Sequence, residues 1–134
     1  MTFYCANCWA MVLESARICP ICGDDITARQ ARADYADKLV AALRHPEPTT
    51  PVRAAWILGE RRERKAVGEL CRLVLSSADA FIIESAVEAL GKIGDRQALP
   101  AVRVAANHPS PLVRAKAQRA LHPLSAGAKP QKMP

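Results

Sequence analysis

The chain has 134 residues, a length that fits one ordinary domain or two small units. Aromatic residues make up 4% of it, and no apolar run approaches the roughly 18 residues of a membrane-spanning helix, so we expect no transmembrane segment. The formal net charge of +6 is compatible with nucleic acid as a partner but does not establish one. The first residues show no secretory signal, and we therefore expect a cytoplasmic protein.

Four cysteines near the start of the chain form two pairs, Cys5 with Cys8 and Cys19 with Cys22. A two-residue spacer lets both thiolates of one turn reach a single ion at about 2.3 Å, and two such turns complete the tetrahedral shell that zinc prefers. The alternative is two disulfides, which a chain without features of a secreted protein disfavours. The pattern therefore predicts one Zn²⁺ ion held by Cys5, Cys8, Cys19 and Cys22.

The residues around the cysteines support a metal site. Pro20 stiffens the second turn, and Gly23 stands where a backbone with positive φ is usually needed. This turn has the form C-P-x-C-G and resembles the knuckles of the small bacterial zinc ribbons, whereas the first turn has Ala6 in place of Pro and Trp9 in place of Gly. We expect Trp9 to be either a lid on the site or an exposed contact.

The predicted ion is structural, because four cysteine ligands leave no open coordination position for a substrate or a water molecule. The ribbon holds too few apolar residues to fold alone, so metal binding should supply most of its folding free energy. Four thiolates and one Zn²⁺ together lower the formal charge by two, to about +4.

An internal repeat follows the ribbon. Three segments align at offsets of 32 and 31 residues, and within each the apolar residues recur every three or four positions, as on one face of a helix. Each unit should therefore be a helix, a turn and an antiparallel helix. The aligned columns contain Ala54, Ala86 and Ala117; Ile57, Ala89 and Ala120; and Leu58, Leu90 and Leu121.

The run from Ala86 to Asp95 (AVEALGKIGD), with the pair Val113-Arg114, resembles the short bacterial form of the HEAT repeats, which also occurs in the phycobilin lyases. The first unit matches less well, because Glu60–Glu63 replaces the apolar-Gly-Asp turn. The resemblance covers about residues 35–122. It implies an all-α fold, a short HEAT-like solenoid of about 2.5 helix-pair repeats plus a capping helix, preceded by the zinc ribbon.

The predicted organisation has four parts, separated where composition or proline and glycine break the pattern. These are a zinc ribbon at 1–24, a connecting segment with the start of the capping helix at 25–34, helical repeats at 35–122 and a disordered tail at 123–134. The predicted helices cover about 27–44, 50–59, 65–76, 80–91, 96–107 and 110–121.

The function that these features favour is a non-enzymatic scaffold or adaptor that binds a protein partner through the solenoid surface or the ribbon. We find no glycine-rich phosphate loop, nucleophile elbow or pair of acids at catalytic spacing. The alternative is a nucleic-acid-binding module that uses the ribbon and a basic solenoid face. A lyase-like or base-processing enzyme is the third hypothesis, since related solenoids include such enzymes.

Several residues are candidates for partner contact. Trp56 occupies a solvent-facing position of the repeat, so it either packs against the ribbon or first helix or is an exposed anchor. The charged turn 60–65 is either a solvated loop or part of a basic stripe that suits phosphates or acidic peptides. Cys71 is interpreted as a small core residue. The candidate partner-binding residues are Trp9, Trp56, Arg61, Arg62, Arg64, Lys65, Arg72, Arg96 and Arg103.

Overall fold

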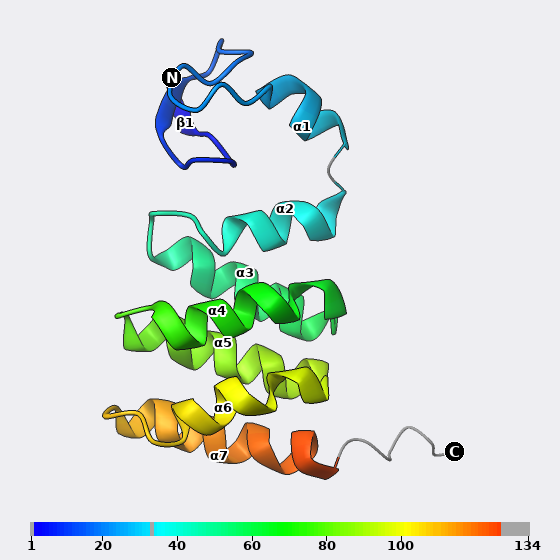
Figure 1. Cartoon of the computed structure of the whole chain (residues 1–134), viewed down its shortest axis with the longest axis vertical. Helices are drawn as coiled ribbons and strands as arrows, with labels where there is room; N and C mark the ends of the chain where they lie inside the picture. Colours follow the sequence, from blue (N-terminus) through cyan, green and yellow to red (C-terminus); the bar gives the residue numbers. More distant parts are fainter. Residues whose placement is uncertain (1, 33, 127–134) are drawn as a thin grey trace.

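The structure, a computed structural model, describes residues 2–32 and 34–126. It is an elongated stack of helices with a small N-terminal unit at one end (Figure 1). In this unit β1 (Thr2–Tyr4) pairs antiparallel with β2 (Met11–Leu13), and α1 (Ile26–Arg32) follows. Among the described residues, no helix combines the length and the apolar character needed to cross a bilayer.

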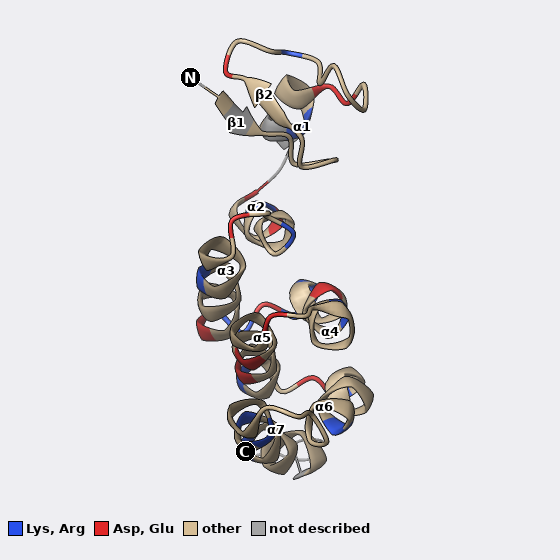
Figure 2. Ribbon diagram, turned by 90° about the vertical axis from the view of Figure 1, so that its left-hand side faces the viewer, with Lys and Arg blue, Asp and Glu red and all other residues tan. Residues whose placement is uncertain are grey.

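The remaining helices form two layers. Figure 2 shows α3, α5 and α7 in one layer and α4 and α6 in the other, while α2 lies at the end nearest the ribbon. The helices are α2 (Tyr35–Ala42), α3 (Thr49–Glu60), α4 (Val67–Ser76), α5 (Ala80–Ile93), α6 (Leu99–Ala105) and α7 (Pro111–Ala126). Short 3₁₀ turns at Arg64–Ala66 (η1) and Arg96–Ala98 (η2) lead into α4 and α6. The predicted all-α solenoid with an N-terminal ribbon is confirmed.

Two predicted boundaries are wrong. The single helix expected at 27–44 is split, because Asp34 has an extended backbone and its carboxylate caps α2 by accepting a hydrogen bond of 2.7 Å from the Asp37 backbone N–H. The start of the tail expected at 123–134 is also wrong, because α7 continues to Ala126 and Leu124 is fully buried. Residues 127–134 of that prediction lie outside the described part of the chain.

The solenoid has one continuous apolar core that runs from Leu39 in α2 to Leu124 in α7. The first repeat column, Ala54, Ala86 and Ala117, is buried throughout, as the 3.6-residue periodicity predicted. A second, smaller core lies in the ribbon. It comprises Cys5, Val12, Cys19 and Ile26, so the ribbon's packing extends past residue 24 into the first residue of α1.

Close contacts between glycine and alanine set the spacing within the α3–α5–α7 layer. A Cβ placed on Gly59 of α3 would lie 2.9 Å from the Cα and 3.1 Å from the Cβ of Ala89 in α5. A Cβ on Gly91 of α5 would lie 3.0 Å from the Cβ and 3.2 Å from the Cα of Ala120 in α7. The same pair of repeat positions therefore brings each helix backbone directly against the next.

We predict that Gly59→Ala destabilises the protein by about 1–3 kcal/mol, because the added methyl group meets backbone atoms that can move only if the two helices separate. Gly68→Ala in α4 is the matched control. Apart from its chain neighbours and the backbone of its own helix, a methyl group at that position would meet no heavy atom within 4 Å, so the same substitution should stabilise the helix by up to about 1 kcal/mol. Urea unfolding measures both, and equal effects of the two substitutions would contradict the steric explanation.

Candidate functional site

The four predicted ligands lie close together in the ribbon. The Sγ atoms of Cys5, Cys8, Cys19 and Cys22 all lie within 4.8 Å of one another. The Cys5–Cys22 and Cys8–Cys19 separations are 3.8 and 3.7 Å, far beyond the roughly 2.05 Å of a disulfide bond. A tetrahedron with metal–sulfur bonds of about 2.3 Å has edges of about 3.8 Å. The cluster therefore has the size and the donors of a four-thiolate metal site, and the disulfide alternative is not supported.

The two cysteine turns have the same backbone form. In each, the residue after the second cysteine donates its N–H to the carbonyl of the first: Trp9 to Cys5 at 2.7 Å and Gly23 to Cys19 at 2.9 Å. Both donors have positive φ, 62° and 78°. Glycine adopts this conformation freely, whereas tryptophan does so at a cost. Although Trp9 stands where glycine is usual, the first cysteine turn thus has the same hydrogen bond and the same positive φ as the second.

Hydrogen bonds around the cluster favour the ionised form of one ligand. The side-chain amide of Asn7 donates to Cys22 Sγ at 3.3 Å, and this contact, followed by a backbone hydrogen bond at Asp24, lowers the pKa of the Cys22 thiol to about 6. At Cys8 a backbone hydrogen bond with Ala10 also lowers the pKa, but burial and the other thiols outweigh it and raise the pKa to about 12. Four thiolates this close require a cation between them.

A polar relay connects the cluster to α1. Arg29 forms an ion pair with Asp24, with Nε 2.7 Å from Oδ2, and its Nη2 donates to Asn7 Oδ1 at 3.2 Å. Asn7 in turn donates to Cys22. Arg29 therefore fixes the orientation of the amide that contacts a ligand, a supporting role that outer hydrogen bonds commonly have at metal sites. Sequence reasoning missed both residues, because neither belongs to the spacing pattern of the ligands.

Trp9 joins the ribbon to the solenoid. Its ring centroid lies 5.1 Å from that of His45, in the turn between α2 and α3, and Tyr4 contacts the same imidazole at 4.7 Å. His45 is itself held by accepting the Glu47 backbone N–H on Nδ1 at 3.0 Å. Trp9 is therefore not a fully exposed contact, because its ring packs against His45. It is partly buried at the junction of the two units.

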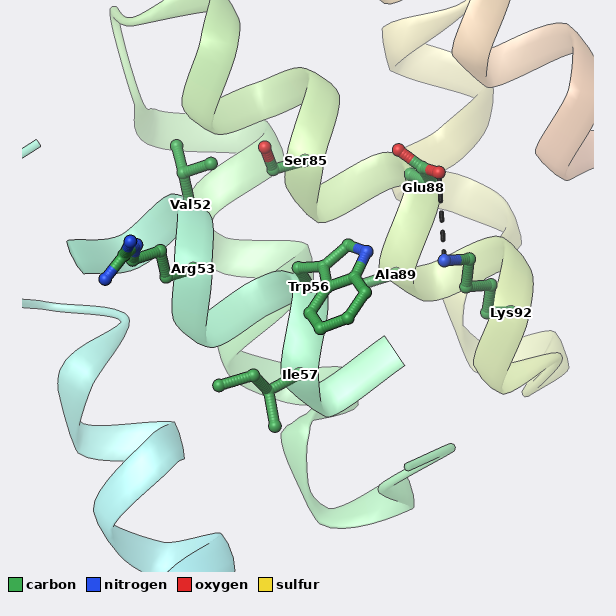
Figure 3. Close-up of a pocket in the computed structure, with 8 residues that line it drawn as sticks. All are labelled: Val52, Arg53, Trp56, Ile57, Ser85, Glu88, Ala89 and Lys92. Carbon is green, nitrogen blue, oxygen red and sulfur yellow. Dashed lines mark ion pairs between the residues drawn. The ribbon is translucent and has the colours of Figure 1, made fainter. Parts of the chain in front are cut away.

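Trp56 lines a pocket of about 500 Å³ between α3 and α5 (Figure 3). Its side chain is 59% exposed, so the predicted packing against the ribbon or first helix is wrong. The Lys92 ammonium lies 5.9 Å from the indole centroid, within the range of a cation–π contact. The remaining lining residues are Val52, Arg53, Ile57, Ser85, Glu88 and Ala89.

A chain of ion pairs crosses the same face of the molecule. Lys92 of α5 contacts Glu60 of α3 and lies 3.8 Å from Glu88, one helical turn away. Lys116 of α7 contacts Glu88 at 2.9 Å, and this hydrogen bond holds the pKa of the Glu88 carboxyl below its usual value. A second hollow, lined in part by Lys116 and Arg119, continues the face onto α7. Sequence reasoning missed these contacts, because they depend on the spacing between helices.

Most of the basic residues that were predicted to bind a partner form contacts within the chain. Arg64 pairs with Asp95 at 3.4 Å, and Arg62 donates to the Lys92 carbonyl at 2.9 Å. Both contacts connect the charged turn to the next repeat. Toward the ribbon end, Lys65 pairs with Asp34 and Asp37, and the Arg61 guanidinium lies 5.1 Å from the Tyr35 ring centroid. The basic side chains of this turn are thus exposed to solvent, but they form contacts with other residues of the chain.

The other basic candidates lie in the second layer. Arg72 of α4 shares Glu69 with Arg44, at 2.8 and 2.6 Å respectively. Burial raises the pKa of Glu69, but the hydrogen bonds from the two arginines outweigh it, and the pKa lies below its usual value. Arg96 and Arg103 are exposed. These three residues and Trp56 therefore belong to different layers and do not form one site.

Comparison with known families matches residues 36–122 to the HEAT repeats. The match covers well over half of the chain, and the protein belongs to this family. No curated protein sequence matches the chain. Among solved structures it is similar to the complex of CpcE and CpcF of phycocyanin lyase from Nostoc sp. PCC7120, with 29% identity and a TM-score of 0.65. The similarity covers 73% of this chain but only 40% of that chain.

We predict that Asn7→Ala weakens metal binding about tenfold, because the substitution removes the amide that contacts Cys22 and is itself fixed by Arg29. Competition with a coloured chelator for Zn²⁺ measures the affinity. Glu14→Ala is the control, since Glu14 is exposed and outside the relay. Equal affinities of the two variants would show that the relay does not support the ligands.

Proposed function

We propose that this HEAT-repeat protein is a non-enzymatic adaptor that binds a protein partner through the open face of the α3–α5–α7 layer. The observation that carries the proposal is the pocket around Trp56, an exposed aromatic beside apolar Val52, Ile57 and Ala89. Exposed aromatic residues next to apolar hollows are the usual anchors of protein–protein interfaces. HEAT solenoids expose extended surfaces of this kind.

The charge distribution favours a protein over nucleic acid. Figure 2 shows that acidic and basic residues occur along the helices of both layers. Most of the cations that were candidates for a phosphate-binding stripe form ion pairs within the chain, as at Arg64 and Lys65. Binding of a phosphate backbone requires a continuous row of available cations, and the stacking of bases requires several aromatic side chains along it.

The contacts of the polar groups in the pocket support a non-enzymatic role. Ser85 donates its hydroxyl to the Phe81 carbonyl at 2.9 Å, and Glu88 is held by Lys116. No lining residue activates another as a base activates a nucleophile. The similar phycocyanin lyase complex leaves an enzymatic role as the second hypothesis. It predicts that a small-molecule substrate or cofactor binds the isolated chain in the Trp56 pocket.

We further propose that the four cysteines hold one Zn²⁺ ion in a structural role. The thiolate donor set and the edge lengths near 3.8 Å suit tetrahedral zinc. The ion, when bound, would offset two of the four thiolate charges and join the two cysteine turns. Cys5, Cys8, Cys19 and Cys22 occupy all four positions of such an ion, so the site contributes to folding rather than to chemistry.

Chelation of the metal should unfold the ribbon and leave the helices from residue 35 onward intact. The ribbon's own apolar core is small, whereas the solenoid has a separate continuous core. Hydrogen exchange measured with and without a chelator should show protection lost in residues 2–32 and retained in α3, α5 and α7. Loss of protection throughout the chain would contradict the independence of the two cores.

Affinity capture from extracts of the organism's own cells tests the adaptor proposal. We expect the tagged protein to retain a specific partner after nuclease treatment, and Trp56→Ala to reduce its recovery at least tenfold. Phe81→Ala is the matched control, because Phe81 is an aromatic side chain that is 67% exposed and lies outside the pocket. Loss of every captured protein after nuclease treatment would favour nucleic acid instead.

A further inference from the structure

We infer that the open face of the α3–α5–α7 layer binds a short extended peptide that carries an apolar side chain flanked by carboxylates. This inference rests on the proposed adaptor function and specifies the chemistry of the partner. It uses the Trp56 pocket for the apolar side chain and the cations on either side of that pocket for the carboxylates.

We infer the apolar side chain of the ligand from the residues that line the pocket. Val52, Trp56 and Ile57 come from α3, and Ala89 comes from α5. The volume of about 500 Å³ lies within the range of pockets that enclose a ligand group. Trp56 remains 59% exposed in the free protein, so an apolar side chain placed there would bury a large aromatic surface.

The acidic part follows from the charges around the pocket. Four cations line this face (Arg53, Lys92, Lys116 and Arg119), against the two anions Glu60 and Glu88. The anions already contact Lys92 and Lys116. Arg53 and Arg119 are exposed and, among the described residues, form no ion pair closer than 4.0 Å. The surplus of two positive charges complements a ligand with acidic residues.

The length of the ligand follows from the helix spacing. Arg53 lies on α3 and Arg119 on α7, with α5 between them. Packed helices are about 8–10 Å apart, so the two arginines are separated by roughly 20 Å across the layer. An extended chain covers about 3.3 Å per residue, and about six residues therefore connect them.

The protein's own C-terminal residues do not fit this description. Residues 127–134 carry Lys129 and Lys132 and no acidic side chain, so their charge repels the surplus cations on the face. A separate acidic partner segment is the occupant that the charges favour.

The test uses a fluorescein-labelled hexapeptide with Leu-Phe at its centre and two Asp residues on each side. We expect it to bind the full chain at least tenfold more tightly than the matched peptide in which Lys replaces every Asp, as measured by fluorescence anisotropy at near-physiological salt. Trp56→Ala should weaken binding at least tenfold, and Arg53→Gln and Arg119→Gln about threefold each. Phe81→Ala should have no effect, because its side chain lies outside the pocket.

Equal binding of the acidic and basic peptides would overturn the inference, and so would equal binding by wild-type protein and Trp56→Ala. Competition by an oligothymidine of the same charge as strong as that by unlabelled peptide would also overturn it. A failure here is distinguishable from failure of the adaptor proposal. If a protein partner survives nuclease treatment but is captured equally by Trp56→Ala, the adaptor proposal stands and its contact surface lies elsewhere.

Discussion

The close approach of glycine to alanine between successive helices is the constraint on which the solenoid depends. Gly59 meets Ala89, and Gly91 meets Ala120, at distances that leave no room for a methyl group without movement of a backbone. In α7 the equivalent position is His122, which is exposed. No further described helix lies against that end of the layer, so the requirement for glycine ends with the stack. The same spacing places α5 side chains beside Trp56.

The ribbon and the solenoid are stabilised in two different ways. The buried core of the ribbon is small and consists of Cys5, Val12, Cys19 and Ile26, and the metal ion that we propose for the four cysteines would supply the cohesion that this core lacks. In the solenoid, apolar burial extends without interruption from α2 to α7. The ribbon contacts the solenoid where Tyr4 and Trp9 pack against His45. The positive φ of Trp9 shows that a bulky side chain is kept where glycine is usual, and its ring contributes to this junction.

Periodic features were predictable from the sequence, and local exceptions were not. The repeat columns identified the helices because small and apolar residues recur at helical spacing. The break before α2 was missed because Asp34 and Asp37 cap each other, a local preference that competes with helix continuation. Pro123 suggested an end to α7, yet the helix continues and buries Leu124. The ligands followed from spacing alone, whereas the Trp56 pocket required knowledge of which α5 residues face α3.

The distances between glycine α protons and alanine methyl protons at the two contacts test most directly whether the helices pack as closely as the structure shows. In a protein labelled selectively at alanine methyl and glycine α positions, nuclear Overhauser effects report proton pairs a few ångströms apart. The structure predicts strong effects between the Gly59 α protons and the Ala89 methyl group, and between those of Gly91 and Ala120. Absence of both effects in the folded protein would contradict the helix spacing on which the core and the Trp56 pocket depend.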